Sequence, residues 1–345
     1  MATFLVTGGA GFIGGHLVEA LIARGHEVRV FDNLSTGNPA TIFGLASLVT
    51  GDVRDAASVM QAMAGVEGVF HLAAIASTQA YLADWAASSA VNAQGGLHVF
   101  EAAARSGVPV VYASSAAVYG EPEALPLTEQ ARTHPLSGYG ADKLALDQHR
   151  LAMADMLGLA ATGLRFFNVY GPRQLRGSPY SGVITAFLDR WEAGEPWTIF
   201  GDGGQTRDFV YVGDVADALC RAMDRVRDGQ AGVYNVCSGQ PTSILTLIDA
   251  MAVALGARPV VRHGPARPGE IRASLGDPAA AARALGFRAT TPLATGIGAI
   301  LADLAKVRPR RDTLVNQDVW VGHDRRADHD DRRRKGAEKL RKGSA

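Results

Sequence analysis

A tyrosine and a lysine at the spacing Y-x-x-x-K have the residue types needed for proton transfer. They are Tyr139 and Lys143 in the stretch "SGYGADKL". Residues four apart share one face of a helix, so the ammonium is expected near the phenol. A positive charge there favours the phenolate and lowers the pKa of the tyrosine, which makes it a base for a substrate hydroxyl. Because this spacing is common, an ordinary structural pair is the alternative.

Two serines at the end of an apolar run supply a candidate partner. Ser114 and Ser115 follow "PVVYA", with Ser115 placed 24 residues before Tyr139. A serine hydroxyl at this point can donate to, or accept from, the same substrate oxygen that the tyrosine contacts. The alternative is that the serine caps a following helix.

A glycine-rich turn near the start of the chain has the pattern of a dinucleotide site. In "LVTGGAGFIGGH", Gly8, Gly11 and Gly14 follow an apolar run and open a helical pattern. Glycines let a pyrophosphate approach the backbone, and the helix N-terminus offers free N–H groups. Asp32 ends the next apolar run and can accept from the adenosine ribose hydroxyls, which favours NAD over NADP. The alternative for Asp32 is a simple turn.

Two further apolar runs end in residues that could also contact the cofactor. Asp52 in "GDVRD" is placed to reach the adenine, and the small residues of "HLAA" (Leu72, Ala73, Ala74) allow a flat ring to approach. Each signal is weak alone. Together they predict a row of cofactor contacts along one sheet edge, because ligands bind at the carboxyl ends of parallel strands.

The elements that must position these residues alternate between strands and helices. Apolar runs such as "TFLVTG", "HEVRVFDN", "GVFHLAA" and "PVVYASS" are separated by helical patterns, including Phe12–Arg24 and Ser89–Arg105. This order predicts an α/β fold with a doubly wound parallel sheet. Residues 1–169, with a returning segment at about 208–240, are predicted to form the cofactor domain. Residues 170–207 and 241–306, where "RPGEIRASLGDPAAAARALGF" predicts loop, short strand and helix, are predicted to form a smaller mixed cap.

Composition narrows the class of protein. The 345 residues have a net formal charge of zero and 47% hydrophobic content, which is typical of a globular protein and argues against a wholly basic nucleic-acid binder. Two cysteines, Cys220 and Cys237, predict neither a disulfide framework nor a zinc site. No apolar run reaches the ~20 residues of a membrane span, so we expect a soluble cytoplasmic protein. Residues 307–345 form a charged tail with 12 Lys/Arg against 7 Asp/Glu, interpreted as a solvated extension.

The set of motifs resembles the extended short-chain dehydrogenases/reductases of the nucleotide-sugar epimerase/dehydratase family. The resemblance covers about residues 1–305 and includes "TGGAGFIG", "FDNLSTG", "SSAAVYG", "YGADK", "RFFNVYGPRQ" and "FGDGGQTRDFVYVGDVA". It implies a Rossmann-type fold with a nucleotide-sugar cap. It also implies NAD as the cofactor and a homodimer that pairs two helices of each subunit, for which Ser89–Arg105 and Ala141–Leu157 are the candidates.

The resemblance also implies roles for individual residues. Tyr139 would take the proton from the sugar 4-hydroxyl, Lys143 would tune Tyr139 and hold the nicotinamide ribose, and Ser115 would position the 4-oxygen. The implied cofactor contacts are Gly8, Gly11, Phe12, Ile13, Gly14, Asp32, Asn33, Leu34, Ser35, Thr36, Gly37, Asp52, Val53, Leu72, Ala73, Ala74, Asn92, Tyr139 and Lys143. The implied substrate contacts are Ser115, Asn168, Arg207, Arg267, Glu270 and Ser274, with the arginines on the diphosphate.

The reaction implied is inversion at C4 of a UDP-sugar through a transient 4-keto sugar. Family members that dehydrate have acidic residues where this chain has Ala116 and Ala117, so dehydration is disfavoured. Asp32 argues against an NADPH-dependent reductase. A non-enzymatic dinucleotide-binding protein is the third class, and the Ser115, Tyr139 and Lys143 set argues against it.

Three positions bear on the sugar. Ser274 stands where epimerases restricted to UDP-glucose and UDP-galactose have a bulky tyrosine, which predicts room for a 2-acetamido group. UDP-glucuronate stays a rival substrate because Arg173 or Arg176 could meet its carboxylate. Ala76 replaces a lysine found in several UDP-galactose epimerases, which weakens a simple galactose-pathway role.

Overall fold

The computed structural model describes residues 1–177, 182–267 and 271–307. The charged tail predicted at 307–345 lies outside this range apart from its first residue. A parallel sheet of seven strands dominates the described part of the chain, in the order β10-β6-β5-β4-β1-β2-β3. The strands are β1 (Thr3–Thr7), β2 (Glu27–Asp32), β3 (Ser47–Thr50), β4 (Gly68–His71), β5 (Val110–Ser115), β6 (Ala161–Phe166) and β10 (Val233–Val236).

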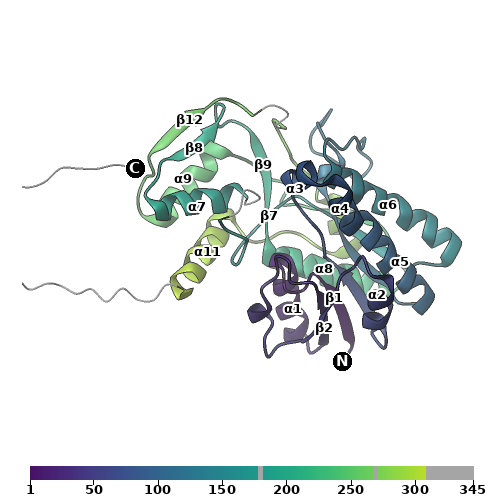
Figure 1. Ribbon diagram of the computed structural model, residues 1–345. Coiled ribbons are helices and arrows are strands. Elements are labelled where there is room, and N and C mark those ends of the chain that lie inside the picture. Colours follow the sequence, from purple (N-terminus) through teal and green to yellow (C-terminus); the bar gives the residue numbers. More distant parts are fainter. Residues whose placement is uncertain (178–181, 268–270, 308–345) are drawn as a thin grey trace, which may run out of the picture. The chain divides into compact units, whose positions relative to one another are not determined.

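Alternation along the strands explains why helices cover both faces of the sheet. In β1, Phe4 and Val6 join one buried cluster and Leu5 joins another, because successive side chains point to opposite faces. The first cluster is completed by α1 (Phe12–Ala23), α8 (Val212–Arg227) and α10 (Ala279–Leu285). The second is completed by α2 (Ala56–Met63), α5 (Gly95–Ser106) and α6 (Gly138–Leu157). Figure 1 shows α5 and α6 side by side.

A second, smaller group of elements follows in the chain. It contains the sheet β11-β9-β7 and the parallel pair β12-β8. Their bounds are β7 (Asn168–Tyr170), β8 (Trp197–Phe200), β9 (Thr206–Tyr211), β11 (Pro241–Ser243) and β12 (Val261–Gly264). Helices α7 (Val183–Ala193), α9 (Ile244–Leu255) and α11 (Leu293–Val307) pack around a separate core in which Phe187 stacks on the buried Trp197.

Two local expectations need correction. The helix expected over Ser89–Arg105 is interrupted by one π-helical turn, η2 (Ala90–Gln94), between α4 (Trp85–Ser89) and α5. Such turns widen a helix locally and often lie at functional sites. The short strand expected after Arg267 is reduced, in its described part, to two isolated bridges, of Ala273 with Thr206 and of Gly276 with Leu127.

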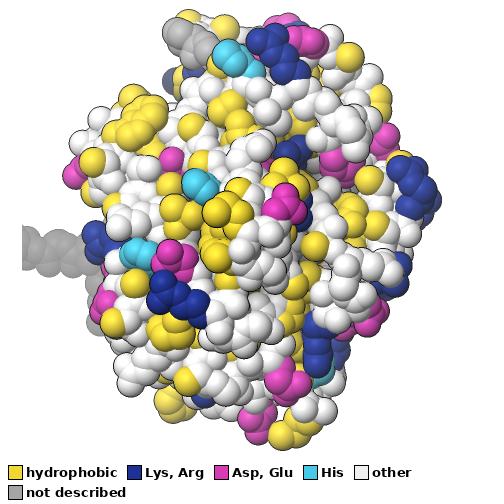
Figure 2. Space-filling view, turned by 90° about the vertical axis from the view of Figure 1, so that its right-hand side faces the viewer, with side chains coloured by type: hydrophobic (Ala, Val, Ile, Leu, Met, Phe, Trp, Pro, Cys, Tyr) yellow, Lys and Arg dark blue, Asp and Glu magenta, His cyan; other side chains and the backbone are white. Residues whose placement is uncertain are grey.

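The remaining described elements are short: η1 (Pro39–Thr41), α3 (Thr78–Ala83) and η3 (Ala116–Val118). No helix among the described residues is both long and apolar enough to cross a bilayer. On the face shown in Figure 2, hydrophobic side chains are scattered between charged side chains of both signs.

Candidate active site

The glycine turn joins β1 to α1 at the point where the strand order reverses, between β1 and β4. Gly8 has a left-handed φ of 70°, and a Cβ there would lie 2.7 Å from the backbone nitrogen of Ala73. A Cβ on Gly14 would lie 2.7 Å from Gly9 Cα and would collide with the Gly8 carbonyl oxygen. Both glycines are therefore required by backbone packing. Gly11 caps α1 with no side-chain hydrogen bond, which leaves N–H groups of the first turn for an anion.

Asp32 lies at the end of β2, where it organises the loop beside the glycine turn. Its two carboxylate oxygens accept from the backbone N–H groups of Ala10, at 3.0 Å, and Leu34, at 2.9 Å. Leu34 adopts a left-handed φ of 58°. These bonds fix the carboxylate at the sheet edge, and each oxygen keeps a lone pair for a hydroxyl donor.

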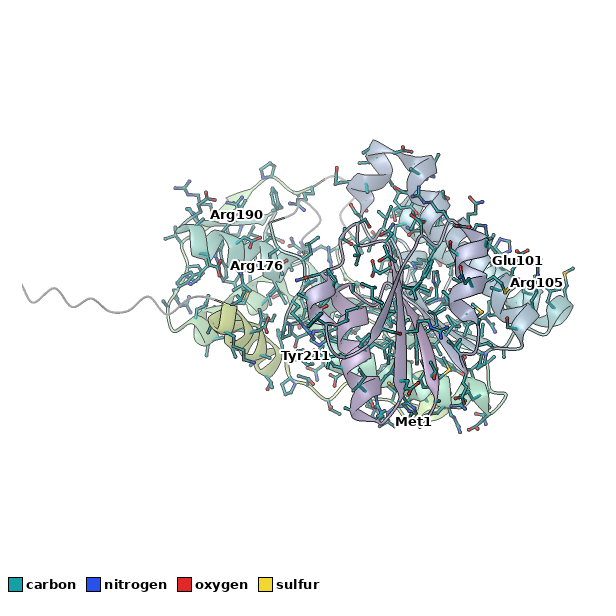
Figure 3. All side chains as sticks on the ribbon, turned by 60° about the horizontal axis from the view of Figure 1, so that its bottom comes forward. Met1, Glu101, Arg105, Arg176, Arg190 and Tyr211 are labelled. Carbon is teal, nitrogen blue, oxygen red and sulfur yellow. The ribbon has the colours of Figure 1, made fainter. Side chains whose placement is uncertain are left out.

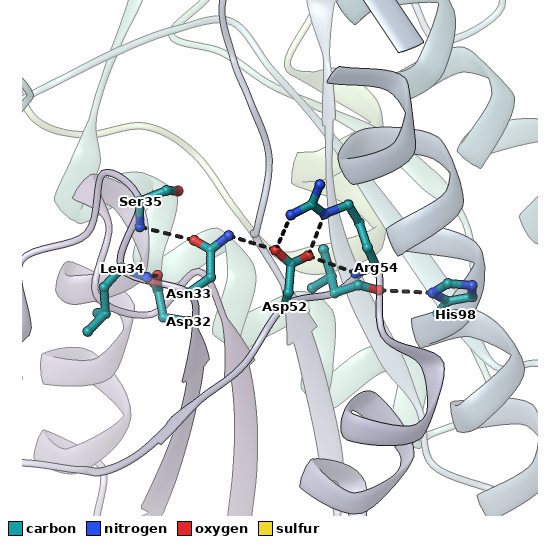
Figure 4. Close-up of polar contacts among 8 residues, drawn as sticks. Asp32, Asn33, Leu34, Ser35, Asp52, Arg54 and His98 are labelled. Carbon is teal, nitrogen blue, oxygen red and sulfur yellow. Dashed lines mark hydrogen bonds and ion pairs between the residues drawn. The ribbon is translucent and has the colours of Figure 1, made fainter. Parts of the chain in front are cut away.

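Asp52 lies next to this loop but is already paired. Arg54 donates to both of its oxygens at 2.9 and 2.8 Å, and Asn33 Nδ2 donates at 3.0 Å (Figure 4). The hydrogen bonds from Arg54 hold the pKa of Asp52 well below its usual range. Asp52 is therefore an ionised, oriented carboxylate, and its contact with adenine stays a prediction.

The end of β4 lies against the glycine turn. Leu72 N–H donates to the Thr7 carbonyl at 3.1 Å, and Ala73 N–H donates to Thr7 Oγ1 at 3.2 Å. Asn92, in the π-helical turn, bonds the backbone N–H of Ile75 at 2.8 Å and its carbonyl at 2.9 Å. Both ends of the Asn92 amide thus fix the loop that follows Ala74.

The candidate catalytic pair lies on the first turns of α6. Ser137 caps this helix by accepting from Gly140 N–H at 3.1 Å, which places Tyr139 and Lys143 on one side. Lys143 Nζ lies 5.7 Å from the centre of the Tyr139 ring. The lysine side chain is buried, and its Nζ has no hydrogen-bond partner among the described residues. A buried ammonium without a partner is costly, so the site is suited to an additional acceptor.

Ser115 completes this group from the end of β5. Its hydroxyl accepts from Ala117 N–H at 3.1 Å, so it caps η3, the alternative considered from the sequence, and it also hydrogen-bonds to Tyr139. The neighbouring Ser114 is buried, and its Oγ has no partner among the described residues. Of the two serines, Ser115 is therefore the one that meets the tyrosine.

The prediction that Lys143 lowers the pKa of Tyr139 is wrong. Burial raises the pKa of Tyr139, and the hydrogen bond from Ser115 lowers it only in part. Burial also lowers the pKa of Lys143 to about 8, while the carboxylates of Asp147 and Asp142 raise it. The reason is desolvation, which disfavours the charged form of both groups and was not visible in the spacing of the motif.

The candidate substrate residues lie in the second group of elements. Arg207 is on β9, beside β7, which carries the exposed Asn168. Ser274 N–H donates to the Thr206 carbonyl at 3.1 Å, which places Ser274 next to Arg207. Arg267 lies over the Phe200 ring, 3.9 Å from its centre. Glu270, also predicted here, lies outside the described residues.

Two buried groups near the candidate pair, His71 and Asp142, were not predicted from the sequence. His71 ends β4, shares a 2.8 Å hydrogen bond with Thr7 Oγ1, and burial lowers its pKa to about 3, with Lys143 adding to the effect. Asp142 lies between Tyr139 and Lys143 in sequence and is buried. A carboxylate inside the Y-x-x-x-K motif is itself a signal, because buried carboxylates are rare unless paired.

Comparison with known proteins agrees with this geometry. The family model described as "NAD dependent epimerase/dehydratase family" matches residues 4–237. The chain belongs to this family. It is 38% identical over 303 residues to a UDP-glucose 4-epimerase of Mycolicibacterium smegmatis, covering 85% of this chain and 95% of that protein.

Solved structures of relatives share the fold. A UDP-glucose 4-epimerase of Thermus thermophilus in complex with NAD has a TM-score of 0.81 and 36% identity, covering 89% of this chain and 100% of its own. A UDP-N-acetylglucosamine 4-epimerase of Methanobrevibacter ruminantium, in complex with UDP-N-acetylmuramic acid, has a TM-score of 0.84 and 32% identity, covering 88% and 98%. Members of the family thus share this architecture while their sugars differ.

Proposed function

We infer that this chain is an NAD-dependent UDP-sugar 4-epimerase. The observation that carries the inference is the group formed by Ser115, Tyr139 and Lys143, beside a glycine turn that opens a helix N-terminus. Family membership and the 38% identity to a UDP-glucose 4-epimerase support it.

The described residues fit NAD. The first turn of α1 offers N–H groups to a pyrophosphate, and the carboxylate of Asp32 is fixed at the sheet edge, where it would accept hydrogen bonds from the ribose hydroxyls. The buried Nζ of Lys143 has no partner in the described part of the chain, so a ribose hydroxyl would satisfy it. When bound, NAD supplies a reversible acceptor for the hydride of C4.

The chain's own residues handle the proton. In its phenolate form Tyr139 accepts the proton of the sugar 4-hydroxyl at Oη, and it returns that proton when C4 is reduced again. Lys143 stabilises the phenolate through its charge, and Ser115 donates a hydrogen bond to Tyr139 Oη or to the sugar 4-oxygen. Because burial raises the pKa of Tyr139, this help from Lys143 and Ser115 is needed near neutral pH.

Elimination of water requires an acid–base group that this chain does not place after Ser115. The next two residues, Ala116 and Ala117, begin η3 and carry only methyl groups. A methyl group neither donates nor accepts a proton, so the proposal is epimerisation rather than dehydration.

The pairing of the two arginines predicted to meet a sugar carboxylate favours a neutral sugar over UDP-glucuronate. Arg176 donates to Asp189 and Glu192 of α7 at 2.7 and 3.0 Å, and Figure 3 shows it beside this helix. Arg173 makes two 2.7 Å bonds to Glu19. Both arginines are thus committed to carboxylates of the protein, and a sugar carboxylate would have to displace them. Ser274 is small and half-buried, which supports acceptance of UDP-N-acetylglucosamine as well as UDP-glucose.

Two wider proposals follow. We propose a homodimer formed through α5 and α6, because Leu151, Met156 and Leu157 of α6 are exposed. Glu101 and Arg105 lie on the outer side of α5 (Figure 3) and would form a polar rim to such an interface. A cytoplasmic location is supported by two cysteines that are free and buried.

Replacement of Tyr139 by phenylalanine tests the assignment. Tyr139→Phe removes one oxygen, so NAD content should be unchanged while turnover falls at least about a hundredfold, within the ~10²–10⁴ typical of a positioned acid–base group. Tyr234→Phe on the edge strand β10 removes the same atom elsewhere and should keep full activity. Unchanged turnover in Tyr139→Phe would remove Tyr139 from the mechanism.

A further inference from the structure

A buried carboxylate, Asp142, lies on α6 between the two candidate catalytic residues. Ser89 Oγ donates to one of its oxygens at 3.1 Å, and Tyr81 Oη donates to the other. Asn92 Nδ2 in turn donates to Tyr81 Oη at 2.8 Å. The donors to Asp142 are thus neutral hydroxyls, and within the described ranges no cation forms an ion pair with it.

Lys143, on the same helix, is a buried group of the opposite charge. Lys143 is 1% exposed, and its ammonium has no hydrogen-bond partner among the described residues. Two carboxylates, those of Asp147 and Asp142, favour its charged form. Asp147 also pairs with a cation of its own, because Arg165 Nε donates to it at 2.9 Å, and it accepts from Tyr112 Oη at 2.9 Å. Asp142 has only neutral donors, and its charge adds to that of Asp147 in favouring the ammonium of Lys143.

The other titratable groups around this pair are neutral near pH 7. Burial lowers the pKa of His71, at the end of β4, to about 3. Burial raises the pKa of Tyr139 on α6, of Tyr81 on α3, and of Tyr112 on β5. None of these groups supplies a negative charge that could replace Asp142.

Hydrogen bonds to Asp142 also tie the start of α6 to the segment α3–α4. Tyr81 packs on Gly138, where a Cβ would lie 2.7 Å from Tyr81 Cε1, and Trp85 meets the Tyr81 ring edge-on with centroids 5.5 Å apart. Because Gly138 precedes Tyr139, a shift of Tyr81 would move the backbone that carries the candidate base.

We propose that Asp142 is a positioning residue whose negative charge keeps the buried Lys143 protonated and whose hydrogen bonds to Tyr81 and Ser89 hold the first turn of α6. The proposal rests on the proposed function, since it assigns Asp142 a task through Tyr139 and Lys143.

The test is a direct titration of Lys143. The chain contains five lysines, so a sample labelled with ¹³C at lysine Cε gives few signals, and Lys143→Met assigns the one of interest. In Asp142→Asn the midpoint of the Lys143 titration should fall by about one pH unit, which is the size expected when a nearby opposite charge is lost. Asp155→Asn removes the same charge from an exposed site on the same helix and should leave the midpoint in place. Asp142→Ser, which also removes the charge, serves if the asparagine variant does not fold.

Tyr81→Phe tests the hydrogen bonds of Asp142 separately from its charge. It keeps the carboxylate charge but removes one donor, so the Lys143 midpoint should stay within a few tenths of a pH unit of the wild type while turnover falls. In the active enzyme, the pH at which the rising turnover profile levels off should follow the titration midpoint of Lys143 in each variant. An unmoved midpoint in both Asp142 variants would overturn the proposal. Failure of the proposed function would instead appear as no turnover of any UDP-sugar by the wild-type protein.

Discussion

The two consecutive glycines in the first turn of α1 allow a matched test of the cofactor site. Gly14→Ala adds a Cβ 2.7 Å from Gly9 Cα, well inside the 3.4 Å at which ordinary contact begins, and against the backbone of Gly8. Because both neighbours are backbone atoms, the turn itself must move. Gly15→Ala adds the same methyl one residue later, where the nearest atom, Thr41 Oγ1, is 3.6 Å away.

The two variants should differ in both stability and cofactor content. Overpacking typically costs about 1–3 kcal/mol, so Gly14→Ala should melt at a lower temperature. If a similar loss falls on NAD binding, affinity drops about tenfold for every 1.4 kcal/mol. Gly15→Ala should retain NAD and be stabilised by up to about 1 kcal/mol, because alanine is the better helix former.

Each variant would be incubated with NAD and desalted, and the acid-released nucleotide would be measured by chromatography alongside a thermal melt. We expect a clear deficit in Gly14→Ala and none in Gly15→Ala. Equal NAD content and equal melting temperatures in the two variants would refute the role given to the glycine turn.

Three other predictions concern the proton and the sugar. Because burial raises the pKa of Tyr139 and lowers that of Lys143 to about 8, turnover should rise about tenfold per pH unit up to pH 8 as the phenolate forms and level off above it as the Lys143 charge is lost, and a profile that keeps rising to pH 9.5 in rate assays would contradict this. Ser274→Tyr should lose activity on UDP-N-acetylglucosamine selectively, and an equal loss on UDP-glucose in parallel assays would sink the idea of an acetamido pocket. Arg176→Ala should leave the ratio of UDP-glucuronate to UDP-glucose rates unchanged, because Arg176 is paired with Asp189 and Glu192, whereas a drop confined to UDP-glucuronate would make Arg176 a substrate contact.

Local signals were sufficient to predict most of the sheet. Each strand is a short apolar run and the glycine turn has backbone requirements of its own, so the order of strands and helices and the place of Gly8 and Gly14 followed from the sequence. The α1 boundary at Ala23 lies within one residue of the prediction, because Gly25 interrupts the helical pattern.

Properties that depend on distant partners could not be predicted in this way. Burial by the whole fold sets the direction of the Tyr139 pKa, against the direction that its helical neighbour Lys143 suggested. Asp142 meets Tyr81, which is 61 residues away in the chain. Arg176 has the right charge for a sugar carboxylate, but it forms ion pairs with two carboxylates of the protein on α7.

Proton NMR of the purified protein with UDP-glucose, UDP-N-acetylglucosamine and UDP-glucuronate in separate tubes tests the central claim most directly. We predict that, with NAD present, the anomeric signal of the C4 epimer grows in the tubes with the two neutral sugars. No change in any tube, or the appearance of a 4-keto-6-deoxy or decarboxylated product, would contradict the assignment as a UDP-sugar 4-epimerase.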